Sequence, residues 1–485
     1  MLHSASSTPD SACDPSPWLQ DHALERHLVH KSTAVRQVRD LVKRGNFEVF
    51  INLCDGAWDE DRAGIEVVQT RERLGAAFTG ANSAFFEPTR EAMKLVCHQF
   101  GIATPNFMFA PDPATAALAG DALRFPMIVK HPNSYGSIGM TRDARVSDRA
   151  QLATQAARMV GEFGGVLIEE FIEGREFTVL VAENPTAPRD PVAFVPAEFR
   201  FPPGETFKHY DLKWIDYAQR TWEPVTDAPL AARLQDMSRK QFLGLGGSGY
   251  GRCDIRMDAG GALYMLEINP NCGIFYPPKD PGSADIILAH DPAGHRGFLD
   301  IVIAAALARQ RRRARKWALR FVQQGGYGLH ATQDIAPDEV IEVHEERPVH
   351  LVSRAHVERN WDAERQRWWR QYAYPLSDEL WAMWSDNPDE WKPINHSCDP
   401  NAWFHGLDLV ARHAIPQGTQ ITLDYATLFA EDLEPFTCHC ESTQCRGVIR
   451  GSDHLLPFVE DRYGEHLSDY IRRKRARVQA SRAAS

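Results

Sequence analysis

Apolar runs of strand length alternate with helically spaced segments through the front half of the chain. FEVFIN (47–52) and FPMIVKH (125–131) are short apolar runs that suit buried strands. Between them, TREAMKLVCHQFG (89–101) has apolar residues at helical spacing, and Gly101 stands where such a helix would end. Alternating strands and helices predict an α+β domain over about residues 46–308.

The last part of this domain has the pattern of a hairpin. GYGRCDIRMDAGGALYMLEINPN (249–271) is two apolar runs around a Gly-Gly turn. This pairing would place Asp254, Glu267 and Asn269 on neighbouring strands. Mg²⁺ binds a few such oxygen ligands and takes its other ligands from phosphate and water, so the hairpin predicts a magnesium site.

Short strands and turns dominate after Lys316. GGYGLHATQDIAPDEVIEV (325–343) and DLVARHAIPQGTQITLDYA (408–426) are strand patterns broken by proline and glycine turns. A tryptophan-rich stretch between them (367–391) is expected to be helix and loop, with its aromatic rings in a core. The pattern predicts a second, mostly β domain.

The whole-chain composition sets limits on function. The 485 residues are 43% apolar, enough for about three domains, and 54 basic against 65 acidic residues give a charge of −11. That charge disfavours a chain-wide nucleic-acid binder. The longest apolar run, 298–308, has the length of a buried helix and is too short for a membrane span. We expect a soluble cytoplasmic protein with reduced or metal-bound cysteines, no membrane partner, and a disordered leader over Met1–Pro17.

Two basic runs stand out against the acidic average. Residues 309–320 contain seven Lys or Arg and no acid, which suggests that a connector begins there. The last fifteen residues, 471–485, contain six basic residues and no acid, and are expected to form a frayed, solvated tail. Docking of either run to an acidic partner or to nucleic acid is the alternative.

The strongest local signal is a group of cysteines. Cys438, Cys440 and Cys445 form C-x-C-x4-C, three ligands where tetrahedral zinc requires four. Cys398, in INHSCDPNAW, could supply the fourth. Ordinary reduced thiols are one alternative. A nucleophile–base pair of Cys398 and His396 is a weaker one, because the downstream cysteines offer the thiol a better use.

The front-half segments, taken in order over about 46–305, resemble the ATP-grasp ligases and most closely the D-alanine–D-alanine ligase branch. Such enzymes phosphorylate a carboxylate with ATP and let an amine displace the phosphate. The resemblance implies that Arg252 stabilises the charge of the collapsing acyl phosphate. It also implies magnesium ligands at Asp254, Glu267 and Asn269. For ATP it implies phosphate contacts at Lys130 and Lys213, with Lys94 a weaker candidate and Ser137 in a Gly-rich loop, an adenine slot lined by Glu169, Phe171 and Ile172, and a ribose contact at Glu176.

Three departures from that branch leave the ligase substrates open. Arg90 stands where the family has a lysine, one helical turn before Lys94. Fewer than fifty residues precede FINLCDG (50–56), which predicts a shortened or absent opening strand and Gly-rich turn. IFYPPKDPG (274–282) lacks the Ser-Leu pair that holds the acceptor's carboxylate.

The back half resembles the SET-domain protein-lysine methyltransferases over about 317–450. The resemblance rests on GGYGLHA, INHSCDPNAW, GTQITLDYA and CHCESTQCRG in that order, and implies a knot-like core and a post-SET zinc segment. Gly326, Tyr327, Gly328, Asn395 and His396 would bind S-adenosylmethionine, Tyr425 would be catalytic, Tyr374 would line the lysine channel, and Cys398, Cys438, Cys440 and Cys445 would bind zinc. Lys392-Pro393 stands where the family often has an arginine–aromatic pair.

The sequence therefore predicts a multidomain, bifunctional enzyme with ATP, magnesium, S-adenosylmethionine and zinc. Its substrates would be a small carboxylate, a small amine and a protein or peptide lysine. A nucleotide-sensing, peptide-binding scaffold is the alternative. The predicted parts are a leader and shortened N-terminal part (1–45), the ATP-grasp part (46–308), a basic linker (309–316), the SET domain (317–430), the zinc segment (431–450), and a C-terminal helix with a basic tail (451–485).

Overall fold

The computed structural model describes residues 1–4, 13–57, 60–133, 138–209, 212, 221–313, 315–322, 326–343, 349–384 and 392–483. It divides into two compact units, a front unit (Met1–Gln310) and a back unit (Arg311–Ser485). Ser137 and Lys213, both predicted to contact ATP, lie outside the described residues. No helix in the described ranges has the length and hydropathy that a membrane span requires.

The front unit opens with a small parallel sheet. It contains β2 (His27–Val29), β1 (Leu2–Ser4) and β3 (Asn52–Leu53) in that order, with helices α1 (Ala34–Arg44) and α2 (Ile65–Arg73) beside it. Leu2 is fully buried in the core that these helices share. The predicted disorder is therefore wrong for residues 1–4 and 13–17, the described part of the leader. The opening strand is present but short, which agrees with the shortened form of the prediction and excludes its absence. A three-residue strand is too short to leave a periodic pattern, and it is held by backbone pairing on both of its edges.

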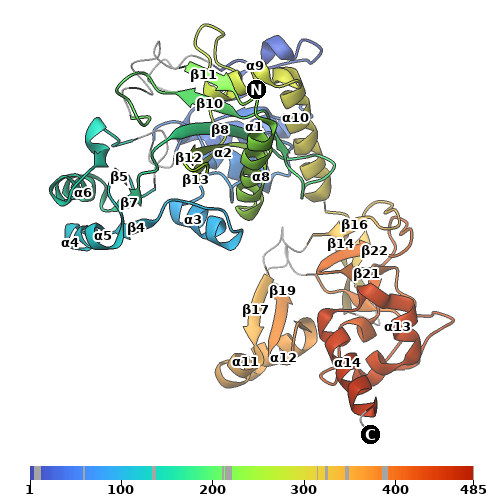
Figure 1. Cartoon of the computed structure of the whole chain (residues 1–485). Helices are drawn as coiled ribbons and strands as arrows, with labels where there is room; N and C mark the ends of the chain where they lie inside the picture. Colours follow the sequence, from blue (N-terminus) through green and yellow to red (C-terminus); the bar gives the residue numbers. More distant parts are fainter. Residues whose placement is uncertain are drawn as a thin grey trace. The chain divides into compact units, whose positions relative to one another are not determined.

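Two antiparallel sheets make up the rest of the front unit (Figure 1). One has the order β4 (Phe107–Ala110), β7 (Val166–Glu170), β5 (Met127–Lys130), β6 (Arg145–Val146), and lies against α4 (Pro113–Ala117), α5 (Ala119–Ala122) and α6 (Arg149–Phe163). The other has the order β11 (Thr221–Pro224), β10 (Ala197–Arg200), β8 (Arg175–Ala182), β12 (Tyr250–Met257), β13 (Leu263–Pro270), with β9 (Val192–Ala193) beside β8 and with α8 (Ala228–Gly244) and α9 (Ser283–His290) packed on it.

The strand and helix predictions for this region are confirmed where they rested on strong local signals. The predicted helix is α3 (Arg90–Gln99), which begins where the Thr89 hydroxyl accepts the Ala92 N–H at 3.0 Å. The predicted hairpin is β12–β13, and Gly261 in its turn has φ +82°. Within it, Asp254 lies directly opposite Glu267.

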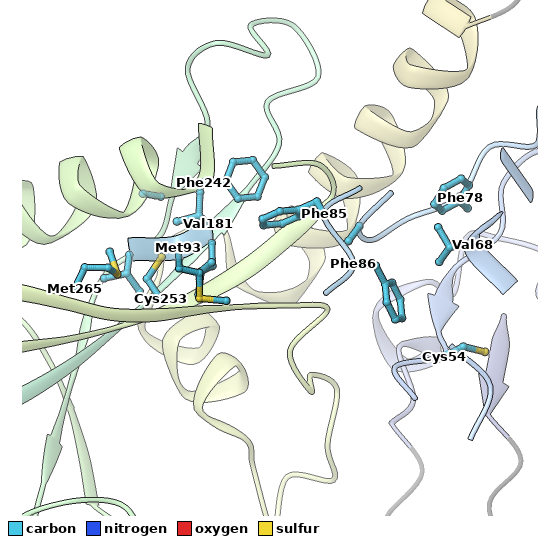
Figure 2. Close-up of a cluster of buried hydrophobic side chains, with 14 of the residues drawn as sticks. Cys54, Val68, Phe78, Phe85, Phe86, Met93, Val181, Phe242, Cys253 and Met265 are labelled. Atoms are coloured by element: carbon cyan, nitrogen blue, oxygen red, sulfur yellow. The ribbon is translucent and has the colours of Figure 1, made fainter. Parts of the chain in front are cut away.

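Helix α3 docks on the second sheet through its apolar face. Figure 2 shows Met93 in the same cluster of buried side chains as Val181 of β8, Phe242 of α8 and Phe85. The Phe85 and Phe242 rings meet edge to face at 5.1 Å. This docking buries the next residue of α3, Lys94, and so places a charged group inside the unit.

Helix α10 (Gly294–Arg313) closes the front unit and extends into the predicted basic linker. Arg309 is buried, pairs with Glu183 at 2.6 Å and donates to the Phe78 carbonyl at 2.6 Å. The basic run therefore does not begin as a free connector, because its first arginine is a fixed part of the front unit.

The back unit is built from short sheets. These are β14 (Trp317–Val322) with β15 (Gly326–Ala331); β16 (Val340–Glu342), β22 (Asp408–Ala411) and β21 (Ala402–His405); β17 (Val349–Ser353), β19 (Leu380–Trp384) and β18 (Tyr374–Pro375); β20 (Asn395–His396) with β23 (Thr422–Leu423); and β24 (Phe436–Thr437) with β25 (Val448–Ile449). The tryptophan-rich stretch contributes much of α12 (Ala363–Tyr372), which follows α11 (Arg354–Asn360). Trp369 and Trp381 are buried with ring centroids 4.8 Å apart, which confirms their predicted core role.

The C-terminal part of the back unit is helical and packed. Helices α13 (Pro457–Tyr463) and α14 (Asp469–Ala483) form a cluster with Ala426 in which Tyr463 and Ile471 are fully or almost fully buried. A C-terminal helix was predicted within 451–485, and α14 continues as a helix to Ala483 where a frayed tail was expected; most of its side chains after Ile471 are solvated, as expected. Its basic composition concealed the few apolar contacts, and Arg475 pairs with Glu460 at 3.0 Å.

Candidate functional sites

A cavity of about 120 Å³ lies in the front unit and is lined by strands of both large sheets. Five cationic side chains line it, and so do five acidic ones. These are Arg90, Lys130, Lys208, Arg252 and Arg256, and Glu169, Glu170, Glu176, Asp254 and Glu267. Apolar side chains, among them Phe171 and Ile172, line the same cavity, as predicted for an adenine slot. The cavity thus combines apolar side chains with paired charges.

Two lysines share one buried carboxylate on the wall of this cavity. Lys94 and Lys130 each place Nζ 2.5 Å from an oxygen of Glu169, which is fully buried. Burial raises the pKa of Glu169, but Lys130 and Lys94 together lower that pKa well below its usual range. Burial lowers the pKa of Lys94. Two predicted phosphate-binding lysines therefore stand side by side with their charges partly neutralised.

The predicted magnesium ligands meet at the β12–β13 pair. Asp254 Oδ2 accepts from Asn269 Nδ2 at 3.3 Å and lies 3.4 Å from Arg252 Nη2. Glu267 pairs with Arg90 at 2.6 Å, so the arginine at the family's lysine position faces a predicted metal ligand. Two carboxylates on facing strand positions, beside an amide side chain whose nitrogen faces Asp254, fit the ligand set that Mg²⁺ prefers once the amide turns its oxygen inward, with room for phosphate and water in the adjoining cavity.

Glu176, predicted to meet the ribose, is held by two cations that the sequence comparison missed. Lys208 Nζ lies 2.8 Å from its Oε1 and Arg256 Nε lies 3.0 Å from its Oε2. Burial raises the pKa of Glu176, and Lys208 and Arg256 lower it to a net value below the usual range. Arg256 could have been found from the sequence, because Arg252, Asp254 and Arg256 alternate along one strand and so share a face. Lys208 lies in a loop and has no such signal.

In the back unit, a parallel strand pair brings together two of the predicted motifs. Asn395 pairs with Thr422 and His396 with Leu423 across β20 and β23. Asn395 Nδ2 donates to the Tyr327 carbonyl at 3.3 Å, which links it to the Gly-Tyr-Gly segment. A Cβ at Gly328 would lie 2.7 Å from that same Nδ2, so a larger residue there would push the Asn395 amide away. The predicted cofactor-binding residues therefore converge.

Tyr425 lies directly beside this pair, in a short 3₁₀ turn. Its hydroxyl donates to the Ile394 carbonyl at 2.9 Å, and its backbone N–H donates to His396 Nδ1 at 3.2 Å. Rings of His396 and Phe429 lie 5.2 Å from its own ring, between centroids. Burial raises the pKa of Tyr425 to about 12, so the phenol stays neutral near pH 7 and can orient a nitrogen lone pair.

Tyr374, the predicted wall of a lysine channel, lies in the interior. It is 6% exposed and its ring stacks against Phe404, with centroids 6.1 Å apart. Burial raises the pKa of its hydroxyl above the usual range. Lys392, at the departure from the family pattern, is also buried and pairs with Glu342 at 2.6 Å, while Glu342 accepts from Trp317 Nε1 at 2.7 Å.

The four predicted zinc ligands come together. The sulfur atoms of Cys398, Cys438, Cys440 and Cys445 all lie within 4.8 Å of one another, and those of Cys398 and Cys438 are 3.9 Å apart. A tetrahedral zinc with Zn–S bonds of ~2.3 Å needs sulfurs about 3.8 Å apart, so this donor set fits the ion with small adjustments. Burial raises the pKa of Cys440, but N–H donors of Cys398 and Ser442 and the neighbouring thiols lower it to a net value of about 7. A thiolate is therefore accessible at neutral pH, as metal binding requires.

One buried carboxylate ties the cysteine segment to Tyr425, and sequence reasoning missed it. Asp424 accepts from Arg446 at 2.6 Å and from the Tyr463 hydroxyl at 2.9 Å. Arg446 immediately follows Cys445, and its backbone N–H donates to the Cys398 sulfur at 3.3 Å. The residue before the predicted catalytic tyrosine thus anchors both the cysteine segment and helix α13.

Comparisons with known proteins agree with this division of the chain. A family model described as the D-ala D-ala ligase C-terminus matches residues 96–276, and a SET-domain model matches residues 326–426. The D-alanine–D-alanine ligase of Bordetella petrii is 30% identical over 254 residues, covering 52% of this chain and 74% of the relative. That of Ralstonia pickettii is 28% identical over 244 residues, covering 50% and 70%. A solved D-alanine–D-alanine ligase from Bacillus anthracis covers 60% of this chain and 89% of its own, with 21% identity and a TM-score of 0.44.

The front unit has an ATP-grasp-like fold, and the back unit contains a SET domain. Through its front unit the chain belongs to the D-alanine–D-alanine ligase family.

Proposed function

We propose that this chain is a cytoplasmic, bifunctional enzyme. Its front unit joins a small carboxylate to a small amine at the expense of ATP, and its back unit methylates lysines of a protein or peptide with S-adenosylmethionine. The observation that supports the proposal is that several described residues of each predicted site lie near one another: Lys130, Glu176 and Arg252 line the front cavity, and His396 contacts Tyr425 in the back unit. In the described ranges, the eight cysteines from Cys54 to Cys445 are free thiols, which supports a reducing compartment.

In the ligase reaction the protein's role is positioning and charge neutralisation. Lys130 lines one wall of the cavity and Lys94 lies behind it on the same carboxylate, so phosphate oxygens would draw Lys130 from Glu169 while Lys94 keeps that carboxylate neutralised. Arg252, held by Asp254 and by the Ser283 hydroxyl at 2.8 Å, faces the same space and would stabilise the charge of the collapsing acyl phosphate. Magnesium held by Asp254, Glu267 and Asn269 would neutralise phosphate charge.

Methyl transfer requires a neutral lysine amine, although free lysine titrates near ~10.4 and its deprotonation at pH 7 costs about 4 kcal/mol. A largely dry aromatic site lowers this cost because it disfavours the ammonium form. The rings of His396, Phe429 and Phe436 around Tyr425 provide such surroundings. S-adenosylmethionine supplies an electrophilic methyl group, and the Tyr425 hydroxyl would orient the attacking nitrogen.

We further propose that residues 431–450 form a zinc segment and that β20 and β23 belong to a knot-like core. The adjacency of the four cysteines and the parallel pairing of the two strands support these assignments.

Radiolabelled S-adenosylmethionine incubated with candidate proteins tests the back unit. Tyr425→Phe should lower labelling by about 10²-fold, because it removes the hydroxyl but keeps the ring. Tyr264→Phe is the matched control, since the Tyr264 hydroxyl donates to Asp258 near the front-unit turn. Equal labelling by wild type and Tyr425→Phe would remove the proposed role.

ADP release in the presence of amino acid pools tests the front unit. Lys130→Ala should abolish it, whereas Lys240→Met should not, because Lys240 pairs with Asp236 on the exposed face of α8. An unchanged rate of ADP release in Lys130→Ala would rule out the ligase assignment. Tight binding of ATP and S-adenosylmethionine without turnover on any substrate pool would favour a nucleotide-sensing scaffold instead.

A further inference from the structure

Lys208 lies in the front cavity between two acidic side chains with different predicted roles. Its Nζ is 2.8 Å from Glu176 Oε1, at the predicted ribose end, and 4.0 Å from Asp254 Oδ1, at the predicted metal end. Among the described residues it is the cation whose ion pairs reach both of these acids. The phosphates of a nucleotide must cross the same interval, because they join the ribose to the metal.

We propose that Lys208 is a phosphate-binding residue of the front site. When a nucleotide binds, its ammonium moves away from Glu176 and pairs with the phosphate next to the ribose. The proposal rests on the nucleotide-dependent function proposed above and adds a residue that no family motif identifies.

Ribose hydroxyls and Lys208 compete for the same carboxylate. A ribose that donates its hydroxyls to Glu176 takes up acceptor capacity that the Lys208 ammonium now uses. The ammonium then needs a new anionic partner nearby, and the first phosphate of the bound nucleotide supplies one. A charge-assisted bond to phosphate is at least as strong as the contact it replaces.

Lys208, rather than Arg256, is the partner of Glu176 that can move. Arg256 also donates to the carbonyls of Ile172, at 2.6 Å, and Thr206, and its guanidinium lies 4.6 Å from the centroid of the Phe171 ring. Hydrogen bonds to three different residues and contact with an aromatic ring hold the Arg256 guanidinium in place. Lys208 makes its closest ion pair with Glu176 through a flexible four-carbon stem, so a change of rotamer carries its charge several ångströms.

Two aromatic rings hold Lys208 inside the cavity during this exchange. Its Nζ lies 4.8 Å from the Trp222 ring centroid and 5.2 Å from that of Phe199. Both residues line the cavity, and the Lys208 side chain is only 18% exposed. Cation–π attraction keeps the ammonium near the nucleotide path instead of releasing it to solvent.

The other cations of the cavity already have different sites. Lys94 and Lys130 meet at Glu169, Arg90 meets Glu267, and Arg252 meets Asp254. Arg90 and Arg252 thus lie at predicted metal ligands, and Lys94 and Lys130 lie at Glu169 of β7 rather than at Glu176. Lys208 is therefore placed for the phosphate closest to the ribose.

Calorimetric titration with adenosine, AMP and Mg²⁺-ADP tests the proposal on the full chain. Lys208→Met should lower the affinity for AMP and ADP about tenfold and leave that for adenosine unchanged, because only the phosphorylated ligands meet the ammonium. Lys208→Arg should recover part of the loss, and Lys240→Met, on the exposed face of α8, should bind as the wild type does.

Each contrary result has its own meaning. An equal loss of adenosine and AMP affinity in Lys208→Met would show that the lysine only shapes the ribose end. Equal AMP affinities in the wild type and the variant would show that the lysine does not contact phosphate. Either result overturns this inference and leaves the proposed function standing. A wild-type chain that binds none of the three ligands would overturn the proposed function, and this inference with it.

A measurement on the wild type removes any dependence on variant folding. Amine-acylation footprinting read by mass spectrometry should show that AMP protects Lys208 and that adenosine does not. Equal protection by both ligands would overturn the proposal.

Discussion

Three buried charges in this chain have different partners. Glu169 is held by two lysines, Asp424 by Arg446 and a tyrosine hydroxyl, and both carboxylates are fully or almost fully buried. Arg71 of α2 is also fully buried, but its Nη1 and Nη2 have no hydrogen-bond partner in the described part of the chain. Its Nε donates to the Val67 carbonyl at 3.2 Å. The first two charges support sites, whereas the third is a cost to the fold.

Replacing Arg71 by methionine should stabilise the front unit. Burial lowers the pKa of Arg71 to about 10, which reflects the penalty of holding its charge away from water. Methionine has a similar length and no donors, so Arg71→Met should raise the free energy of unfolding by about 1–3 kcal/mol in denaturant titrations. Arg71→Lys keeps the charge and should give no gain. A loss of stability in Arg71→Met would mean that stacking on Phe78, 4.6 Å away, outweighs the burial of charge.

Glu169 should make the front unit sensitive to acid. Its folded-state pKa lies below the unfolded value of ~4.3, so its contribution is complete above that pH and is lost as the pH falls through the folded pKa. Glu169→Gln should cost about 3–5 kcal/mol at pH 7, because it leaves two buried lysines without their anion. The dependence of its unfolding free energy on pH below ~4.3 should be flatter than in the wild type.

The matched control for this prediction is Glu223→Gln. Glu223 pairs with Arg200 on the surface and is about half exposed, so its loss should change stability by less than ~1 kcal/mol. Equal losses in the two variants would contradict the role given to Glu169.

Among the elements, the β24–β25 pair depends most on what surrounds it. Each strand has two residues, too few for a stable hairpin, and the four cysteines enclose the pair. A metal bound by these thiols would supply the stability that backbone pairing cannot.

The purified chain should therefore contain about one zinc ion, and chelation should loosen this segment. Hydrogen exchange over 436–449 should become faster and the back unit should melt earlier, while the front unit is unchanged. Cys438→Ser should lose the metal, whereas Cys13→Ser, in the front unit, should keep it. Full metal content in Cys438→Ser would contradict the ligand set.

The elements that the sequence predicted were those with strong local patterns. The α3 helix has a capping threonine, and the β12–β13 hairpin has a glycine turn. The three residues of β1 carry no period, so the sequence did not locate this strand. A C-terminal helix was predicted, but its extension through the basic residues of α14 was not, because their basic surface hides a few buried contacts such as Ile471. In both, packing against distant residues determines the structure.

The residues of the candidate sites also fall into two groups, those that the sequence could identify and those that only the fold reveals. Residues carried by family motifs, such as Lys130 and Tyr425, could be named from the sequence. Lys208 and Asp424 could not, because their importance lies in the groups opposite them, Glu176 and Arg446, which only the fold brings close.

At the scale of the whole molecule, each unit has hydrophobic clusters of its own. Leu2 and Phe242 belong to a cluster of the front unit, and Trp317 and Leu423 to one of the back unit. Chains of 1–313 and 315–485, expressed separately, should each fold, and their calorimetric transitions should add up to those of the full chain. A fragment that stays unfolded would show that its core is incomplete alone.

The packing of α13 and α14 on the turn that holds Tyr425 has a consequence for synthesis. Translation delivers the front unit first, and domains generally fold as they emerge. Tyr425 and His396 leave the ribosome before Arg446, Tyr463 and Ile471, which complete their surroundings. A nascent or prematurely terminated chain would then carry a finished ligase-like unit and an unfinished SET domain, so the order of synthesis itself would delay the proposed methyl transfer until residues 446–471 have been made.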